Sequence, residues 1–175
     1  KLASASIVNE QLLVAVGRAG IPAILSTGGA TLGEIDAAAD VLWDESEPAP
    51  LPFALLQCTA TYPCQPADMH LRVIGALRER FEGTVIGLSD HQDGIAMAPV
   101  AYALGARIFE KHFTLHRSWK GSDQAFSLEP GGLRRMVRDL RRAREALGDR
   151  VKRRLPAEVP SLVKMGRADL VGVRA

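Results

Sequence analysis

Short apolar runs alternate with longer segments of helical periodicity along the 175 residues of the chain. The apolar runs predict four buried strands, over 22–26, 53–58, 84–89 and 107–112. The segments between and after these runs predict helices that begin at Thr31, run over 68–81, follow Gly94 and begin at Pro130. Thr31 and Glu34 form the T-x-x-E signature of a helix start. Strands that alternate with helices in this way form a parallel sheet.

The residues at the predicted strand ends favour a (β/α)8 barrel over the alternative, a doubly wound sheet. These ends lie 22 to 32 residues apart and carry Ser4, Ser26, Cys58, Ser89 and His112. Barrel enzymes build their sites at this face, from the ends of several strands. No G-x-G-x-x-G motif opens the first helix, which argues against a dinucleotide-binding sheet. Since a full barrel takes about 250 residues, we expect part of a TIM barrel, with four strands and the stub of a fifth that ends near Ser4.

Two histidines at neighbouring strand ends predict a metal site. His91 ends the segment G-L-S-D-H, and His112 lies in F-E-K-H-F at the end of the next strand. Sequential barrel strands are neighbours about 4.8 Å apart, so the two imidazoles can share one cation such as Mn, Fe, Co, Ni or Zn. Glu110 has the same strand parity as His112 and should face the same side. Either histidine alone would be a satisfied core residue, but two on adjacent strand ends favour the metal site.

Weaker candidates surround the histidines. Asp123 lies in the polar loop 119–123, where it either accepts hydrogen bonds from sugar hydroxyls or caps a turn. Tyr62 follows the second strand and is either a lid contact or a packing residue. The serines at the strand ends, together with Lys1, could hold a phosphate or carboxylate through hydroxyls and one cation.

Composition excludes several other classes of protein. The chain is 47% hydrophobic and 24% charged with a net charge of +2, which argues against disorder and against a nucleic-acid or membrane partner. The longest uncharged apolar run, 94–106, is too short for a membrane span. The arginines of 134–154 could form a basic patch, but apolar residues at helical spacing make them the solvated face of a helix. Two cysteines are too few for a disulfide framework and favour a reducing, cytoplasmic setting. Because structured sequence starts at once with Lys1, we expect a piece of a longer protein.

Several long motifs resemble the sialic acid synthase family in order and spacing. They are K-L-A-S-A-S-I-V-N at the start, I-L-S-T-G-G-A-T at 24–31, and the segments 56–74, 87–95, 105–115 and 119–130. The family comprises phosphoenolpyruvate-dependent N-acetylneuraminate synthases and relatives for legionaminic, pseudaminic and 9-phosphorylated sialic acids. The resemblance implies that residues 1–150 form barrel strands five to eight of a catalytic domain. It implies that 151–175 are a linker toward an antifreeze-like domain that caps the partner subunit's site, so the full-length protein would be a homodimer.

The resemblance also implies a reaction and a site. The C3 atom of phosphoenolpyruvate attacks the aldehyde of N-acetylmannosamine or a related amino sugar, water adds to C2, and phosphate leaves with cleavage of the C–O bond. His91 and His112 match the ligands of a divalent metal, usually Mn²⁺ with Mg²⁺ or Co²⁺ as alternatives, which polarises the aldehyde. The positions that match phosphoenolpyruvate contacts are Lys1, Ser4, Ser26 and Ser89. The positions that match sugar contacts are Tyr62 and Asp123, and Asp123 is counted with the two histidines as catalytic.

Some positions depart from the family pattern. Ser6 stands where the family usually has an acidic residue, and Ala60 stands where many members have Asn or Ser. Gln57 and the loop 119–123 match animal-type enzymes and favour a 6-phosphorylated amino sugar, with Lys120 as the candidate phosphate contact, whereas S-D-H at 89–91 is closer to the bacterial pattern. We expect the isolated chain to be inactive. The alternative is a truncated, non-catalytic fragment that acts only as a folding or interaction module.

Overall fold

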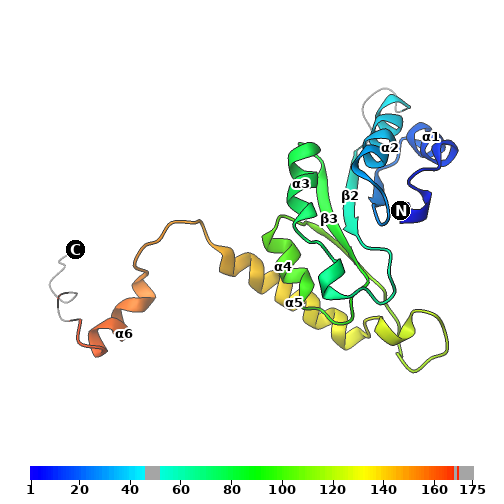
Figure 1. Ribbon diagram of the computed structural model, residues 1–175. Helices are drawn as coiled ribbons and strands as arrows, with labels where there is room; N and C mark the ends of the chain where they lie inside the picture. Colours follow the sequence, from blue (N-terminus) through cyan, green and yellow to red (C-terminus); the bar gives the residue numbers. More distant parts are fainter. Residues whose placement is uncertain (46–51, 168, 170–175) are drawn as a thin grey trace. The chain divides into compact units, whose positions relative to one another are not determined.

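The computed structural model describes residues 1–45, 52–167 and 169, which fall into two units, 1–145 and 146–175. The first unit contains a four-stranded, wholly parallel sheet (Figure 1). The strands follow chain order: β1 (Ala23–Ser26), β2 (Phe53–Cys58), β3 (Val85–Asp90) and β4 (Ile108–Lys111). An isolated parallel bridge joins Leu2 to Leu25 of β1, and Leu2 lies where the sequence predicts the stub of a further strand. The predicted half-barrel of parallel βα units is therefore present.

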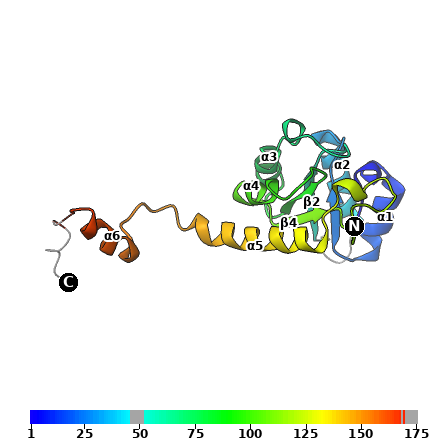
Figure 2. The same ribbon diagram turned by 90° about the horizontal axis from the view of Figure 1, so that it is seen from below.

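Helices lie before, between and after the strands along the chain. They are α1 (Glu10–Ala19), α2 (Leu32–Asp44), α3 (Val73–Arg80), α4 (Met97–Ala103) and α5 (Pro130–Leu147). Helices α3 and α4 pack against β3, and Figure 2 shows α2, α3 and α4 arranged around one side of the sheet. The predicted helix start at Thr31 is confirmed, because its hydroxyl accepts from the Glu34 N–H while the Glu34 carboxylate accepts from the Thr31 N–H at 2.7 Å.

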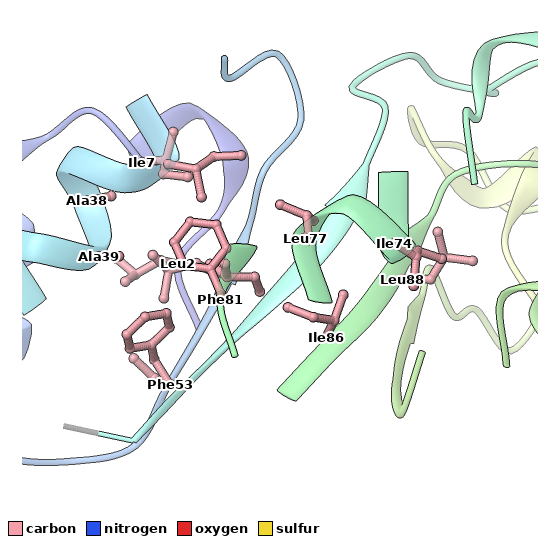
Figure 3. Close-up of a cluster of buried hydrophobic side chains, with 14 of the residues drawn as sticks. Leu2, Ile7, Ala38, Ala39, Phe53, Ile74, Leu77, Phe81, Ile86 and Leu88 are labelled. Carbon is pink, nitrogen blue, oxygen red and sulfur yellow. The ribbon is translucent and has the colours of Figure 1, made fainter. Parts of the chain in front are cut away.

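The main hydrophobic core lies between the sheet and these helices. Ile74 and Leu77 of α3 belong to the same buried cluster as Ile86 and Leu88 of β3 (Figure 3). All four side chains are at most 2% exposed. Strand residues of the opposite parity, such as Leu56 and Ser89, face away from the helices. The sheet therefore has one face that packs on helices and another that is free to carry a site.

One helix begins later than its sequence pattern predicts. Instead of a helix over 68–81, the chain forms a 3₁₀ turn at Pro66–Asp68, and α3 starts only at Val73. His70 lies between the two with a φ of 43°, which an α-helix cannot contain. The apolar periodicity is the same on both sides of His70, so the sequence pattern does not reveal the break.

The second unit contains the end of α5, a 3₁₀ turn at Pro156–Glu158 and the short helix α6 (Val159–Lys164). Helix α6 falls within the segment 151–175, whose assignment as a linker stays a prediction. Residues 168 and 170–175 of that segment, and residues 46–51 of the predicted turn before β2, lie outside the described part of the chain. Within the described part, the structure has no helix whose length and apolar character would suit a bilayer crossing.

Candidate active site

The face of the sheet opposite to α2, α3 and α4 carries the candidate site at the carboxyl ends of its strands. The strand register aligns Cys58 with Ser89 and Ser89 with Glu110, and it aligns Ser26 with Leu56. Paired residues of a parallel sheet point to the same side, and so do residues two apart on one strand. These side chains therefore share one face, and an open cavity of about 350 Å³ beside it is lined in part by Leu56, Glu110 and His112.

His91 and His112 lie immediately after β3 and β4, and their rings meet edge to face with centroids 5.2 Å apart. The Nδ1 atom of His91 is 3.0 Å from the carbonyl oxygen of Thr59. A carbonyl only accepts, so Nδ1 carries a proton, and in the neutral form of this imidazole Nε2 keeps a free electron pair. The Nδ1 atom of His112 lies 3.6 Å from the Asp123 carboxylate, too far for a direct hydrogen bond.

The two histidines titrate in opposite directions. Burial lowers the pKa of His91, but its contacts with the Cys58 thiol and the Thr59 carbonyl outweigh burial, so this pKa is raised. Burial and the charge of His91 lower the pKa of His112, and the carboxylates of Asp123 and Glu110 only partly oppose this. At neutral pH His112 is therefore uncharged, which is the form that coordinates metal ions.

Aromatic side chains enclose the two imidazoles. The Tyr62 ring lies 4.2 Å from the His91 ring and 5.8 Å from the His112 ring, measured between centroids. Phe126 stands 5.3 Å from His112. The loop that carries Tyr62 is attached to the site, because the Cys64 N–H donates to the His91 carbonyl at 2.9 Å. Tyr62 is itself 53% exposed, so it is positioned between the histidines and solvent.

The loop between β4 and α5 brings Asp123 to His112. Arg117 holds this loop: its backbone N–H donates to the Glu129 carboxylate at 3.0 Å, and its guanidinium donates to Asp93 at 3.1 Å and to the Ala125 carbonyl. The Ser127 hydroxyl also donates to the Asp123 carbonyl. The sequence alternatives for Asp123 were a turn cap and a site residue, and the structure places its carboxylate in the histidine cluster.

A second polar group lies on the same face of the sheet. The Lys1 ammonium is 3.0 Å from one oxygen of Glu110, and the Ser89 hydroxyl donates to the other at 2.7 Å. Burial raises the pKa of Glu110, but the bonds from Ser89 and Lys1 outweigh burial, so this pKa is lowered and the carboxylate stays ionised. Ser4 accepts from the Gly28 N–H at 2.9 Å and contacts the Cys58 thiol.

The Ser26 hydroxyl lies on the same face but is not hydrogen-bonded to the other predicted site groups. It is buried and has no hydrogen-bond partner among the residues described. A buried unpaired hydroxyl costs free energy unless a ligand or water satisfies it.

The donor set suits a metal ion only in part. His91 and His112 offer two nitrogens, and no group of three or more His, Cys, Asp or Glu side chains with ligand geometry occurs within 1–45, 52–167 and 169. Two imidazoles fit a site whose other coordination positions belong to water and substrate oxygens. Two imidazoles with open positions match the donor set of a catalytic metal site and not that of a closed structural one.

Two residues that contact the histidines, Thr59 and Phe126, were not predicted from the sequence. Thr59 acts through its backbone carbonyl, which no side-chain motif reveals. Phe126 lies in the motif segment 119–130, and an aromatic residue close to Asp123 in that segment is a signal for a contact in the site. Of the departures, Ser6 lies in the turn Ser4–Ser6, and Ala60 lies beside Gly28, close to the Ser4 hydroxyl.

A half-barrel of parallel βα units defines the class, a partial TIM barrel. The comparisons with known proteins give the particular family: a model of the NeuB family matches residues 1–152, and the chain belongs to this family. It is 37% identical to human N-acetylneuraminate-9-phosphate synthase over 99% of this chain and 47% of that enzyme. It is 38% identical to Campylobacter jejuni pseudaminic acid synthase over 85% of this chain and 42% of that enzyme. The chain thus spans about half the length of these curated relatives.

A solved structure agrees with the family assignment. The sialic acid synthetase of Leptospira borgpetersenii, crystallised with citrate, superposes with a TM-score of 0.80 at 34% identity, covering 95% of this chain and 57% of that one. The family resemblance inferred from the motifs is therefore confirmed.

Proposed function

We propose that this chain supplies strands five to eight of a barrel that condenses phosphoenolpyruvate with an amino sugar. The products are a sialic acid-type nonulosonate and phosphate. The observation that carries the proposal is the pair His91 and His112, with ring centroids 5.2 Å apart at the ends of adjacent strands. The names of the relatives, a sialic acid phosphate synthase and a pseudaminic acid synthase, support this reaction class. N-acetylmannosamine, a related amino sugar or a 6-phosphorylated form is the acceptor.

The two histidines would hold a divalent metal, Mn²⁺ in the first place and Mg²⁺ or Co²⁺ as alternatives. When bound, such a cation polarises a carbonyl oxygen as a Lewis acid. The hydrogen bond from Nδ1 of His91 to the Thr59 carbonyl leaves Nε2 as the ligand atom, and the metal would bind in exchange for the Nε2 proton that the raised pKa of His91 favours. His112 is uncharged at neutral pH, since burial and His91 lower its pKa. Tyr62 covers His91 and limits the access of water to the reacting carbonyl.

Phosphoenolpyruvate would bind to the serine and lysine groups on the same face. Its phosphate and carboxylate oxygens accept hydrogen bonds, and the Ser26 hydroxyl, which has no other partner among the described residues, would donate to one of them. Lys1 would exchange its ion pair with Glu110 for an anionic group of the substrate. Ser4 and Ser89 add hydroxyl donors. The attack of C3 on the sugar aldehyde forms the new C–C bond, water adds to C2, and the C–O bond breaks to release phosphate.

The acceptor sugar would contact Asp123 and Tyr62 from the side of the β4–α5 loop. The Asp123 carboxylate accepts hydrogen bonds from sugar hydroxyls, and Tyr62 offers a ring face and one hydroxyl. Lys120, in the same loop, is the candidate contact for a phosphate on the sugar.

Turnover needs the remaining barrel strands and, for the whole protein, a homodimer. The sheet ends at β4, and β1 is extended only by the single Leu2–Leu25 bridge. The alternative, a non-catalytic module, is favoured by the departures at Ser6 and Ala60.

We place the protein in the cytoplasm, where the buried thiols of Cys58 and Cys64 would stay reduced.

Titration calorimetry with Mn²⁺ tests the proposal on the 175-residue chain. We expect one bound ion, and His91→Ala and His112→Ala should each abolish binding. His116→Ala is the matched control, because His116 stacks on Trp119 outside the cluster. Equal binding by the two site variants would contradict the metal site. The chain alone should release no phosphate from phosphoenolpyruvate and N-acetylmannosamine, and robust turnover would contradict the half-barrel.

A further inference from the structure

A buried ion pair lies directly behind the two histidines. Asp90 and Lys111 are register partners on β3 and β4, and each immediately precedes one histidine. The Lys111 ammonium is 2.9 Å from the Asp90 carboxylate, and both side chains are only 4% exposed. Because successive strand side chains alternate between faces, this pair lies on the face opposite to Ser89 and Glu110. Both side chains therefore point away from the two polar groups of the candidate site.

Lys111, the residue before His112, contacts both residues that flank His91, Asp90 and Gln92. The Lys111 ammonium donates to the Gln92 carbonyl as well as to Asp90. The second Asp90 oxygen accepts from the Gln92 N–H at 2.8 Å. The backbone segment 90–92 is thus closed around His91 and fastened to residue 111.

Stability does not explain why this pair is charged. Burying two charges costs desolvation that their attraction barely repays, and well-packed apolar replacements of buried ion pairs are often neutral or stabilising. What an apolar pair cannot do is donate to the Gln92 carbonyl. The specific consequence of the charged pair is the fixed relation between the backbones of His91 and His112.

We propose that Asp90 and Lys111 are positioning residues that set the spacing of the His91 and His112 rings for one cation. This inference rests on the proposed function, in which the two imidazoles hold a divalent ion. Residues that orient metal ligands typically change metal affinity by about 10- to 100-fold when they are replaced. The pair acts through the backbone of its neighbours and touches neither metal nor substrate.

The test uses the double variant Asp90→Asn with Lys111→Met in the 175-residue chain. It removes both charges together, so no unpaired charge is left buried, and it removes the donor to the Gln92 carbonyl. We expect the variant to fold and to bind Mn²⁺ about 10- to 100-fold more weakly by titration calorimetry. The control is Asp36→Asn with Arg80→Met, which removes an exposed ion pair between α2 and α3 and should leave Mn²⁺ affinity unchanged.

A second readout needs no metal. In the metal-free wild type, nuclear Overhauser effects should connect the ring protons of His91 and His112, and the variant should lose them. Loss of affinity together with loss of these effects supports the proposal, and any other result in a folded variant overturns it. If the wild type binds no Mn²⁺, the proposed metal site fails, and the ring contacts alone decide on the positioning role.

A second double variant, Asp90→Leu with Lys111→Met, covers the case that the first one unfolds. It replaces the ion pair by apolar side chains and is judged by the same two readouts. Unfolding of both double variants would overturn the proposal, because the pair would then be required for folding and not for the spacing of the rings.

Discussion

At Gly28 a single added methyl group would meet two side chains of the candidate site. A Cβ atom there would lie 2.8 Å from the Ser4 hydroxyl, 2.9 Å from the Cys58 sulfur and 3.1 Å from the Ala60 methyl. Real Cβ contacts are longer, so Ser4 and Cys58 must rotate away. Rotation of Ser4 breaks its bond from the Gly28 N–H, worth about 1 kcal/mol, and crowding of a packed region costs about 1–3 kcal/mol.

We therefore expect Gly28→Ala to lower the free energy of unfolding by about 1–3 kcal/mol. Urea unfolding followed by circular dichroism measures this as a lower midpoint at unchanged slope. The matched control is Gly33→Ala in α2, where an added Cβ meets nothing within 4 Å. Alanine suits a helix better than glycine, so the control should gain up to about 1 kcal/mol.

The opposite signs of the two alanine substitutions make the reasoning refutable. If Gly28→Ala were as stable as the wild type while Gly33→Ala behaved as expected, the close approach of Ser4, Cys58 and Gly28 would be wrong. The position of Ser4 in the candidate site would then be wrong as well.

Three further predictions concern the core, a helix start and pH. Leu77→Ala should cost about 2–5 kcal/mol in urea unfolding, because Leu77 is fully buried, whereas Leu115→Ala, at 54% exposure, should change stability by less than about 0.5 kcal/mol. Thr31→Ala should cost about 1 kcal/mol through loss of the capping box, and an unchanged midpoint would contradict that role. The pKa of Glu110 is lowered in the fold, so its contribution to stability is present above the ordinary glutamate pKa and is lost as pH falls through the folded value. Urea midpoints should therefore fall less steeply on acidification for Glu110→Gln than for the wild type, and parallel curves would exclude this contribution.

The sequence by itself determined the four strands and their order, whereas it did not predict the helices α1 and α6. Strands β1 to β4 lie within one or two residues of the apolar runs that predict them. Strands of a parallel sheet covered by helices are continuous apolar runs, which makes them visible in one dimension. The capping box at Thr31 is equally local, since both partners lie within four residues. The sequence also predicts that His91 and His112 lie close together, because consecutive βα units place consecutive strand ends side by side.

Only the tertiary structure decided which groups surround the histidines and how they are held. The Thr59 carbonyl, the Phe126 ring and the ion pair of Asp90 with Lys111 come from loops or from the opposite face of the sheet. Lys1 reaches Glu110 across the site although 109 positions separate them in the chain. Such contacts depend on strand register and on loop closure, which are set by packing over the whole unit and leave no periodic trace in the sequence. The sequence therefore identifies the candidate site residues, and the packed sheet sets the distances between them and their protonation states.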